Sequence, residues 1–277
     1  MSAALERFAR CVGREDFGLA DACLMIAEDV YPDVDIPAGL AQLDAIAATI
    51  RSRLPVDAFP EQKLAALNHC LFTELKFAGN ADDYDDPRNS YLNEVLARRL
   101  GIPITLSILY LEVGRRLGLP LQGVAFPGHF LVKLRVSRGE LILDPFNRGA
   151  TLSLGELRRR VLSTLPAGVD EDLDISPLLQ ATPPRFIIAR VLRNLKEIYL
   201  RANRLDRALE VMHRLLAMLP GSAEELRDRG LIHARMECFG PAVEDLQGYL
   251  RRKPDADDAD AIGRELGSLR AAAARIS

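Results

Sequence analysis

Two side chains with the chemistry of a catalytic pair stand near the ends of neighbouring predicted strands. His129 lies just before a stretch that alternates apolar and polar residues, and Asp144 closes the next apolar stretch, in the sequence VAFPGHFLVKLRVSRGELILDPFN of residues 124–147. An imidazole held by a carboxylate is the arrangement in which histidine acts as a general base towards a nucleophile. The pair therefore raises the question of which residue supplies the nucleophile.

Three residues are candidates for that nucleophile, and each also has a purely structural interpretation. Ser107 and Thr105 lie in an apolar predicted helix, and hydroxyls inside helices usually bond to a carbonyl one turn back. Cys70 follows His69 at the border of an apolar stripe, where a free cysteine is usually inert. We retain Ser107 as an alternative nucleophile. The structural interpretation of the histidine–aspartate pair itself is that it only pins two strand ends together.

The elements around the pair are predicted to be a helical opening, a buried helix and a β-hairpin. Residues 1–78 carry apolar residues at helical spacings of three and four, and prolines separate the segments. Residues 101–118 are apolar over most of a helical surface, as expected of a helix in the centre of a domain. Residues 130–136 then alternate between apolar and polar side chains, and SRGE turns the chain into LILDPF, which predicts a hairpin.

An acidic loop with four aspartates, residues 79–90, precedes a predicted helix that Asn89 or Ser90 is placed to cap. So many aspartates raise the question of calcium. Their register lacks the ligand pattern and the terminal glutamate of an EF-hand, so a solvated, turn-forming loop is the better interpretation. We expect no metal site and no cofactor.

The C-terminal part follows an acidic, proline-bearing linker at residues 170–185 and repeats itself with a period of about 34 residues, the length of a tetratricopeptide repeat. In such a repeat two antiparallel helices cross at small residues and a proline ends the second helix. We predict two repeats and a capping helix over residues 259–276, which either only complete the fold or present a face that binds peptides. The matching positions are Tyr199 and His233, Ala202 and Met236, Leu205 and Phe239, Ala208 and Ala242, Leu209 and Val243, Met212 and Leu246, Leu215 and Tyr249, and Pro220 and Pro254.

The order of these features resembles the transglutaminase-like superfamily. Within it, NSYLNEVLARRLGIPITLSILYLEVGRRLGLPLQGVAFPGHFLVKL followed by LILDPFNRG is similar to the bacterial SirB family, whose members join such a core to C-terminal tetratricopeptide repeats. The resemblance covers nearly the whole chain. It implies an α+β fold, with a transglutaminase-like (papain-like) core and helical N-terminal part over residues 1–180, and an all-α tetratricopeptide-repeat domain over residues 181–277.

The resemblance also implies that the nucleophile has been lost. In active members of the superfamily a cysteine starts the central helix, and counting back from Gly118 by the spacing of the superfamily gives Pro103 at that position. A thiol at a helix N-terminus is activated by the dipole and the free N–H groups, and its own N–H is a usual oxyanion donor. Proline supplies neither sulfur nor N–H, although it is also simply a good first residue for a helix.

The function that follows is that of a pseudoenzyme, a non-catalytic scaffold that binds a protein or peptide partner. The alternative is a cysteine-independent hydrolase or acyl transferase that uses His129, Asp144 and Ser107. We expect a binding groove where the acidic loop, the segment before His129 and the DPFN turn converge. Its predicted lining consists of Tyr84, Asn89, Tyr91, Phe126, Pro127 and Asn147.

Composition limits the other classes of function. The chain has 277 residues and a net charge of -3 from 36 basic and 39 acidic residues, which are mixed along the sequence without a basic stripe for nucleic acid. The four cysteines are scattered, the N-terminus lacks a signal-peptide core, and the apolar runs are far shorter than the ~20 residues of a membrane helix. We therefore expect a cytoplasmic protein with no nucleic-acid or membrane partner, and we leave its oligomeric state open. That the protein is bacterial is implied by the resemblance to the SirB family.

Overall fold

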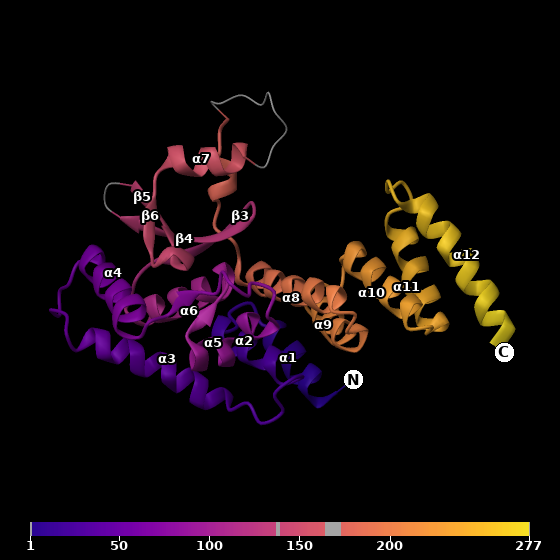
Figure 1. Ribbon diagram of the computed structural model, residues 1–277, viewed down its shortest axis with the longest axis horizontal. Coiled ribbons are helices and arrows are strands. Elements are labelled where there is room, and N and C mark those ends of the chain that lie inside the picture. The colour runs from indigo at the N-terminus through magenta and orange to yellow at the C-terminus, as the bar shows by residue number, and fades with distance from the viewer. Residues whose placement is uncertain (1, 137–138, 164–172, 277) are drawn as a thin grey trace. The chain divides into compact units, whose positions relative to one another are not determined.

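The computed structural model of the chain describes residues 2–136, 139–163 and 173–276 (Figure 1). The predicted turn residues 137–138 and the first part of the predicted linker, residues 170–172, lie outside the described residues. No helix among the described residues is both long and apolar enough to span a membrane.

The contacts of the chain divide it into two compact units. The first, called the core unit below, comprises residues 14–191. The second, called the repeat unit, comprises residues 1–13 together with residues 192–277. The domain boundary that the sequence predicts between residues 180 and 181 stays a prediction.

Helices make up much of the core unit, and local chemistry explains where they start. They are α2 (Leu19–Ala27), α3 (Ile36–Arg51), α4 (Pro60–Asn68), the π-helical turn η1 (His69–Glu74), the 3-10 turn η2 (Pro87–Ser90), α5 (Leu92–Arg98), α6 (Pro103–Arg116), α7 (Leu154–Leu162) and the 3-10 turn η4 (Ser176–Leu179). The carboxylate of Asp35 caps α3 by accepting a hydrogen bond from the amide of Ala38 at 2.8 Å. Proline stands in the first turn of α3, α4 and α6, where a missing N–H leaves no bond unmade.

A four-stranded antiparallel sheet carries the candidate catalytic pair. Its strands are β3 (Leu121–Phe126), β4 (His129–Val136), β5 (Gly139–Asp144) and β6 (Ala150–Leu152). Each strand pairs with the one that follows it in the chain, and the predicted hairpin is present, with Val136 paired to Gly139. Two short strands, β1 (Ala78–Gly79) and β2 (Leu100–Gly101), form a separate parallel pair that contacts α6.

Both faces of the sheet are covered, by α6 on one side and by α7 on the other (Figure 1). The apolar cluster on the α7 side includes Val124, Phe126, Leu131, Ile142, Leu152, Leu157 and Val161. On the opposite side α6 is buried over residues 103–114, as predicted for a central helix. Each fully buried large apolar side chain contributes about 1.5–3 kcal/mol, so this packing fixes the strand ends that carry His129 and Asp144.

A tight turn determines where His129 stands. Phe126 at the end of β3 pairs with His129 at the start of β4, which leaves only Pro127 and Gly128 in the turn. Gly128 has a φ of +67°, a left-handed conformation that glycine adopts without strain, and proline before it is typical of a type II turn. The Pro-Gly pair thus places the imidazole at the sheet end.

The acidic loop folds into turns, and its predicted cap is wrong. The N-cap of α5 is Tyr91, which makes no side-chain capping bond, because the 3-10 turn η2 intervenes between the loop and the helix. Asp86 caps that turn by accepting from the amide of Arg88 at 2.9 Å, and it also pairs with Arg98. Among the described residues, His, Cys, Asp and Glu side chains form no group of three or more suited to a metal ion.

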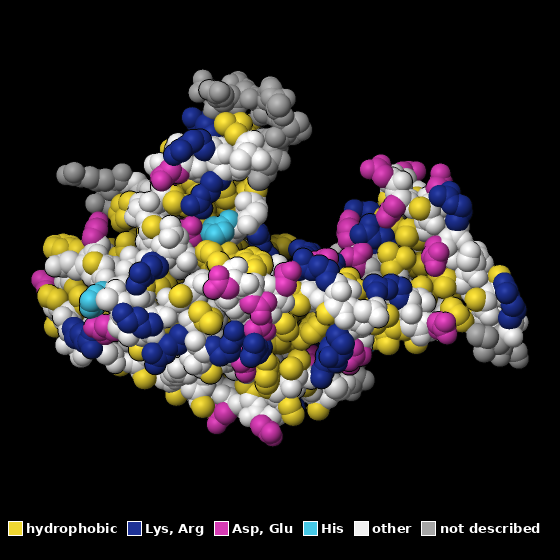
Figure 2. All heavy atoms as spheres, viewed as in Figure 1, with side chains coloured by type: hydrophobic (Ala, Val, Ile, Leu, Met, Phe, Trp, Pro, Cys, Tyr) yellow, Lys and Arg dark blue, Asp and Glu magenta, His cyan; other side chains and the backbone are white. Residues whose placement is uncertain are grey.

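The repeat unit confirms the period predicted from the sequence. Its helices are the last part of α8 (Pro184–Arg201), α9 (Leu205–Met218), α10 (Ala223–Arg235), α11 (Phe239–Arg252) and α12 (Ala259–Ile276). Both bounds of α11 lie one period after those of α9, and the end of α10 lies one period after the end of α8. Ala208 and Ala242 are fully buried at equivalent positions, as expected where helices cross closely. Acidic and basic side chains are interspersed on the surfaces that Figure 2 shows.

The first helix, α1 (Ala3–Val12), belongs to the repeat unit. It contacts α9 and buries Leu5, Phe8 and Val12. The guanidinium of Arg214, a fully buried side chain of α9, lies 4.9 Å from the centroid of the Phe8 ring in a cation–π contact. The sequence prediction placed these residues in the N-terminal domain. An amphipathic pattern shows which face of a helix is buried but does not show which other element buries it.

Candidate functional site

His129 and Asp144 form a hydrogen-bonded pair at one end of the sheet. Nε2 of His129 lies 2.8 Å from Oδ1 of Asp144. Because β4 begins at His129 and the antiparallel β5 ends at Asp144, the strand pairing brings the two side chains together. The side chain of Asp144 is 3% exposed and that of His129 is 18% exposed. With Nε2 turned to the carboxylate, the ring presents Nδ1 on its other side, in the orientation that a general base needs.

Asp144 is held by more than the histidine. Oδ1 also accepts the amide of Asn147 at 3.3 Å, which caps the 3-10 turn η3 (Pro145–Asn147), and Oδ2 lies 3.3 Å from Nη1 of Arg160 in α7. Burial alone raises the pKa of Asp144, but the hydrogen bond and charge of His129, together with Arg160 and the amide of Asn147, outweigh burial and hold this pKa below its usual value. Asp144 is therefore ionised at neutral pH and orients the imidazole.

The imidazole ring also has an apolar neighbour. The ring of Phe146 meets it edge-on, with centroids 5.9 Å apart and an interplanar angle of 87°. Phe146 itself lies against Gly79 of β1, where an added Cβ would come within 2.4 Å of Cε2 of Phe146. Within the described part of the chain, no hydroxyl or thiol lies within hydrogen-bonding distance of the His129 ring.

The start of α6 lies beside the start of β4. Pro103 is the first residue of α6 and is buried. The fully buried hydroxyl of Ser107 donates to the carbonyl of Phe130, the residue after His129, at 3.4 Å. Pro103 precedes Ser107 by about one helical turn, roughly 6 Å of rise. The predicted alternative nucleophile, Ser107, thus bonds to the main chain of β4 and not to the imidazole.

Thr105 joins the acidic loop to this helix start. Its Oγ1 donates to the carbonyl of Asn89 at 2.7 Å and accepts from the amide of Ile102 at 3.1 Å. Its hydroxyl is therefore engaged on both sides. The contact fixes the loop against the first turn of α6.

The six residues predicted to line a groove separate by exposure. Tyr84, Pro127 and Asn147 are exposed, whereas Asn89, Tyr91 and Phe126 are buried. The Asn89 amide group donates to the carbonyl of Asp83 at 2.7 Å, and the ring of Tyr91 packs edge-on against Tyr31 with centroids 5.5 Å apart. The buried residues therefore support the chain segments, and contact of the exposed ones with a ligand stays a prediction.

Two arginines of this region were missed by the sequence analysis. Arg160 reaches Asp144, and the guanidinium of Arg190 in α8 lies 3.5 Å from the carbonyl oxygen of Phe126. Arg160 is one of three consecutive arginines, and Arg190 belongs to a helix whose pattern continues into the repeats. No pattern in the neighbouring sequence predicts that either arginine belongs to the site.

Cys70 is poorly suited to act as a nucleophile. It is 3% exposed and lies in the π-helical turn η1. Burial and the charge of Glu74 raise the pKa of the Cys70 thiol, and Arg53 opposes them only in part. A buried thiol that stays protonated does not attack carbonyls.

Comparison with known proteins identifies the family. Residues 38–193, more than half of the chain, match the family described as the transglutaminase-like superfamily. The chain belongs to the transglutaminase-like superfamily. Its residues 195–267 match a tetratricopeptide repeat, so the transglutaminase-like core and the repeats predicted from the sequence are both confirmed.

The bacterial relatives of this transglutaminase-like protein match it over nearly the whole of both chains, whereas a mammalian relative matches only part of it. The "UPF0162 protein" of Xylella fastidiosa (strain 9a5c) is 42% identical over 258 residues, which cover 93% of this chain and 92% of the relative. The "UPF0162 protein" of Vibrio cholerae is 30% identical over 92% of this chain and 94% of its own length. "F-box only protein 21" of Homo sapiens is 37% identical over 129 residues, which are 43% of this chain and 20% of that protein. The bacterial relatives confirm the resemblance to the SirB family.

Proposed function

We propose that this protein binds a peptide segment of a partner protein at the His129 end of its transglutaminase-like core and does not transform it. The observation that carries the proposal is the ring of His129, which is oriented by Asp144 at 2.8 Å but has no thiol or hydroxyl beside it among the described residues. A base without a nucleophile to deprotonate cannot begin acyl transfer.

The start of α6 supports this proposal. If Pro103 occupies the position of the superfamily nucleophile, the chain lacks both the sulfur and the main-chain N–H that would stabilise an oxyanion there. The hydroxyl of Ser107 is fully buried and bonded to the carbonyl of Phe130, so its use as a nucleophile would require a rearrangement of α6. The groups that are exposed at the His129 end of the core are therefore suited to binding a peptide.

The repeat unit offers a second contact surface to the same partner. Tetratricopeptide repeats generally mediate protein–protein interaction, and the match over residues 195–267 supports this role. Ion pairs join neighbouring repeats, since Arg193 pairs with Glu225 at 2.7 Å and Lys196 pairs with Asp228 at 2.6 Å. They keep the helix pairs in register and leave the exposed side chains of the helices for a ligand.

One observation favours a second function, a cysteine-independent hydrolase or acyl transferase. The pairing of Nε2 with Asp144 leaves Nδ1 directed away from the carboxylate, as in a working general base. Such an enzyme would use His129 and Asp144, with Ser107 as the nucleophile after it leaves its bond to the carbonyl of Phe130. It would turn over an ester or amide substrate at a rate that depends on His129.

Affinity selection from a soluble library of random dodecapeptides tests the proposal. Peptides that stay bound to the full chain are identified by mass spectrometry, synthesised, and measured by fluorescence polarisation. Tyr84→Ala removes the 46% exposed ring of a residue predicted to line the groove and is expected to weaken binding about tenfold, a typical loss for an aromatic anchor. Phe59→Ala, which removes a 69% exposed ring just before α4, is the matched control.

Each result separates the two functions. Binding that depends on Tyr84, with peptides recovered intact, supports the binding role. Peptides hydrolysed by the wild type and left intact by His129→Ala establish the enzyme and overturn the proposal. Peptides whose affinity is indifferent to Tyr84→Ala place the binding site elsewhere and also overturn it.

A further inference from the structure

Arg190, in the first part of α8, is a partly buried arginine without an acidic neighbour. Among the described residues, no carboxylate lies within ion-pairing distance of its guanidinium. Other partly buried arginines have such partners: Arg98 pairs with Asp86, Arg116 with Glu112, and Arg229 with Asp245. A desolvated cation without a counter-ion is costly, so an anion bound beside Arg190 would stabilise it.

The contacts of Arg190 hold its guanidinium in place without neutralising it. Nη1 and Nη2 are each 3.5 Å from the carbonyl oxygen of Phe126, and Cζ lies 5.7 Å from the centroid of the Phe130 ring. Burial lowers the pKa of Arg190 and nearby Tyr84 offsets part of this effect, yet a guanidinium stays protonated at neutral pH. Long bonds to one carbonyl leave N–H donors of the guanidinium available.

Arg190 stands next to the candidate catalytic pair. Phe126, whose carbonyl it contacts, pairs with His129 across the two-residue turn. The neighbouring Tyr84 is 46% exposed, and Phe186, one helical turn before Arg190 in α8, is 50% exposed. A cation flanked by two exposed aromatic rings is suited to a ligand that joins an anionic group to apolar atoms.

We propose that Arg190 binds a carboxylate group of the peptide held at the His129 end of the core. This inference rests on the proposed function and names the chemistry that the site selects. The two N–H groups at one edge of a guanidinium match the two oxygens of a carboxylate, and such charge-assisted bonds are shorter and stronger than a bond to a carbonyl. The carboxylate belongs to an Asp or Glu side chain or to the C-terminus of the peptide, because Arg190 would bind each in the same way.

Neutral replacements in the selected dodecapeptides test the inference on the wild-type protein. Each Asp is replaced by Asn, each Glu by Gln, and the C-terminal acid by an amide, one at a time, and affinities are measured by fluorescence polarisation. One replacement is expected to weaken binding by about 10- to 100-fold, the range for a bidentate charged contact. The identity of that replacement tells a side-chain carboxylate from a C-terminal one.

Variants of the protein then assign the contact to Arg190. Arg190→Gln is expected to bind the original peptide as weakly as the wild type binds the neutral peptide. Its affinities for the two peptides should differ by less than twofold. Arg190→Lys keeps the charge without the paired N–H groups and is expected to fall between them. Arg135→Gln makes the same change of charge at an exposed position near the other end of β4 and is expected to bind like the wild type.

The outcomes distinguish this inference from the proposed function. If Tyr84→Ala weakens binding but no neutral replacement does, the peptide binds at the site without a carboxylate, so the inference fails and the proposed function stands. If Arg190→Gln still discriminates acid from amide, another residue reads the carboxylate and the inference is overturned. If no peptide binds in a way that depends on Tyr84, the proposed function fails as well.

Discussion

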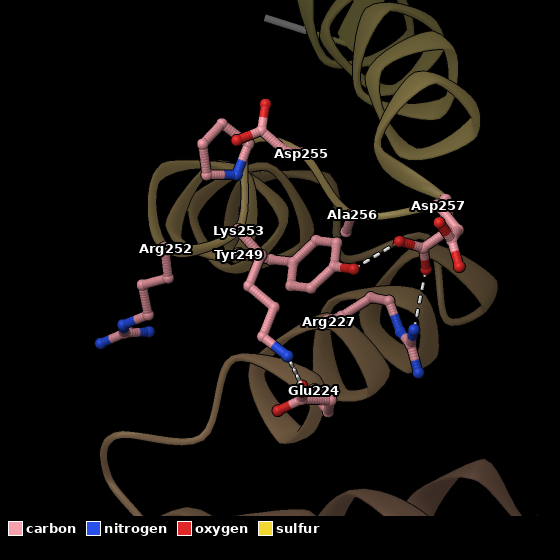
Figure 3. A pocket seen from close by; sticks show the side chains of 10 residues that line it. Glu224, Arg227, Tyr249, Arg252, Lys253, Asp255, Ala256 and Asp257 are labelled. Carbon is pink, nitrogen blue, oxygen red and sulfur yellow. Dashed lines mark hydrogen bonds and ion pairs between the residues drawn. The ribbon is translucent and has the colours of Figure 1, made fainter.

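Charged side chains serve different purposes in the repeat unit and around His129. In the repeat unit an open hollow of about 700 Å³ is lined by residues of both signs, and several of their charges are paired with one another (Figure 3). Arg227 lies 2.7 Å from Asp258, Tyr249 donates to the same carboxylate, and Lys253 pairs with Glu224. These groups meet one another's hydrogen-bonding and charge requirements and so stabilise the fold of the repeat unit.

At the His129 end of the core unit, by contrast, some polar groups lack such partners. Arg190 has no carboxylate partner among the described residues, and His129 uses one ring nitrogen for Asp144 while the other has no hydroxyl or thiol beside it there. Asp144 is the exception, since His129, Arg160 and the amide of Asn147 all bind it. The paired charges stabilise the fold of the repeat unit, whereas the guanidinium of Arg190 and the ring of His129 are the groups to which we assign the proposed ligand.

The largest effect is expected from Asp144→Ala. This change removes a buried acceptor that faces His129 and Arg160 and caps the following turn, so the free energy of unfolding should fall by about 3 kcal/mol. Urea unfolding followed by circular dichroism measures it. A loss as small as that of an exposed ion pair would show that Asp144 does not hold the strand ends together.

The pH dependence of the free energy of unfolding tests the same contribution of Asp144 to stability. The folded pKa of Asp144 is lowered, so its contribution to stability is present above the unfolded pKa near 3.9 and is lost as the pH falls through the folded pKa. The wild type should therefore lose more stability than Asp144→Asn between pH 5 and pH 2. Parallel stability curves for the two proteins over this range would contradict the assignment.

In the repeat unit, the close packing of the helices at Ala208 can be tested through its effect on stability. Ala208→Leu places a large side chain at a fully buried helix crossing and is expected to lower the free energy of unfolding by about 2 kcal/mol through overpacking. Ala271→Leu, at an exposed position of α12, is the matched control and should leave the urea midpoint unchanged. Equal midpoints for the two variants would count against a close crossing at Ala208.

Pro103→Cys tests whether the base near α6 still works. The helix start and the imidazole both favour a thiolate, so the new cysteine should react with iodoacetamide about tenfold faster at pH 7 than an ordinary thiol with a pKa of about 8.5, and His129→Ala should lower the rate again. Mass spectrometry of the labelled peptides measures both rates. Cys238 is the internal standard, because it is exposed whereas Cys23 and Cys70 are buried. Labelling no faster than at Cys238 would remove Pro103 from the nucleophile position.

The smallest effect is expected from Lys253→Met. Its partner Glu224 and Lys253 itself are each about half exposed, and exposed ion pairs contribute little to stability. The urea midpoint should not change measurably. A clear loss would mean that the charges of the hollow are coupled as a network, which would strengthen the contrast with the isolated Arg190.

Much of the fold could be predicted because its signals are local. The repeat period is written in matching apolar and small residues, and the structure repeats its helix bounds at that interval. The hairpin between β4 and β5 follows from the alternation of residues 130–136, and the burial of α6 from its apolar surface. The order of a histidine before one strand and an aspartate after the next was enough to pair His129 with Asp144.

The features of the candidate site that the sequence did not predict depend on contacts between residues far apart in the chain. The guanidinium of Arg190 meets the carbonyl of Phe126, 64 residues earlier, and nothing in the sequence of a helix tells which strand end its arginines face. The same holds for the exposure of the predicted groove residues, because Asn89 is buried by bonds within its own loop while Tyr84 is not. Side-chain position at the site is a tertiary property that residue types alone do not specify.

The pairing of α1 with α9 bears on the order in which the chain is made. α1 is made before its partner α9, which begins only at Leu205, so the apolar residues Leu5, Phe8 and Val12 lack their contact with α9 while residues 14–191 are synthesised. Those residues are complete and free to fold before α1 finds its place. A fragment designed to isolate the core should therefore begin after residue 13, since any shorter chain that keeps α1 and ends before α9 carries a helix whose binding partner has not been made.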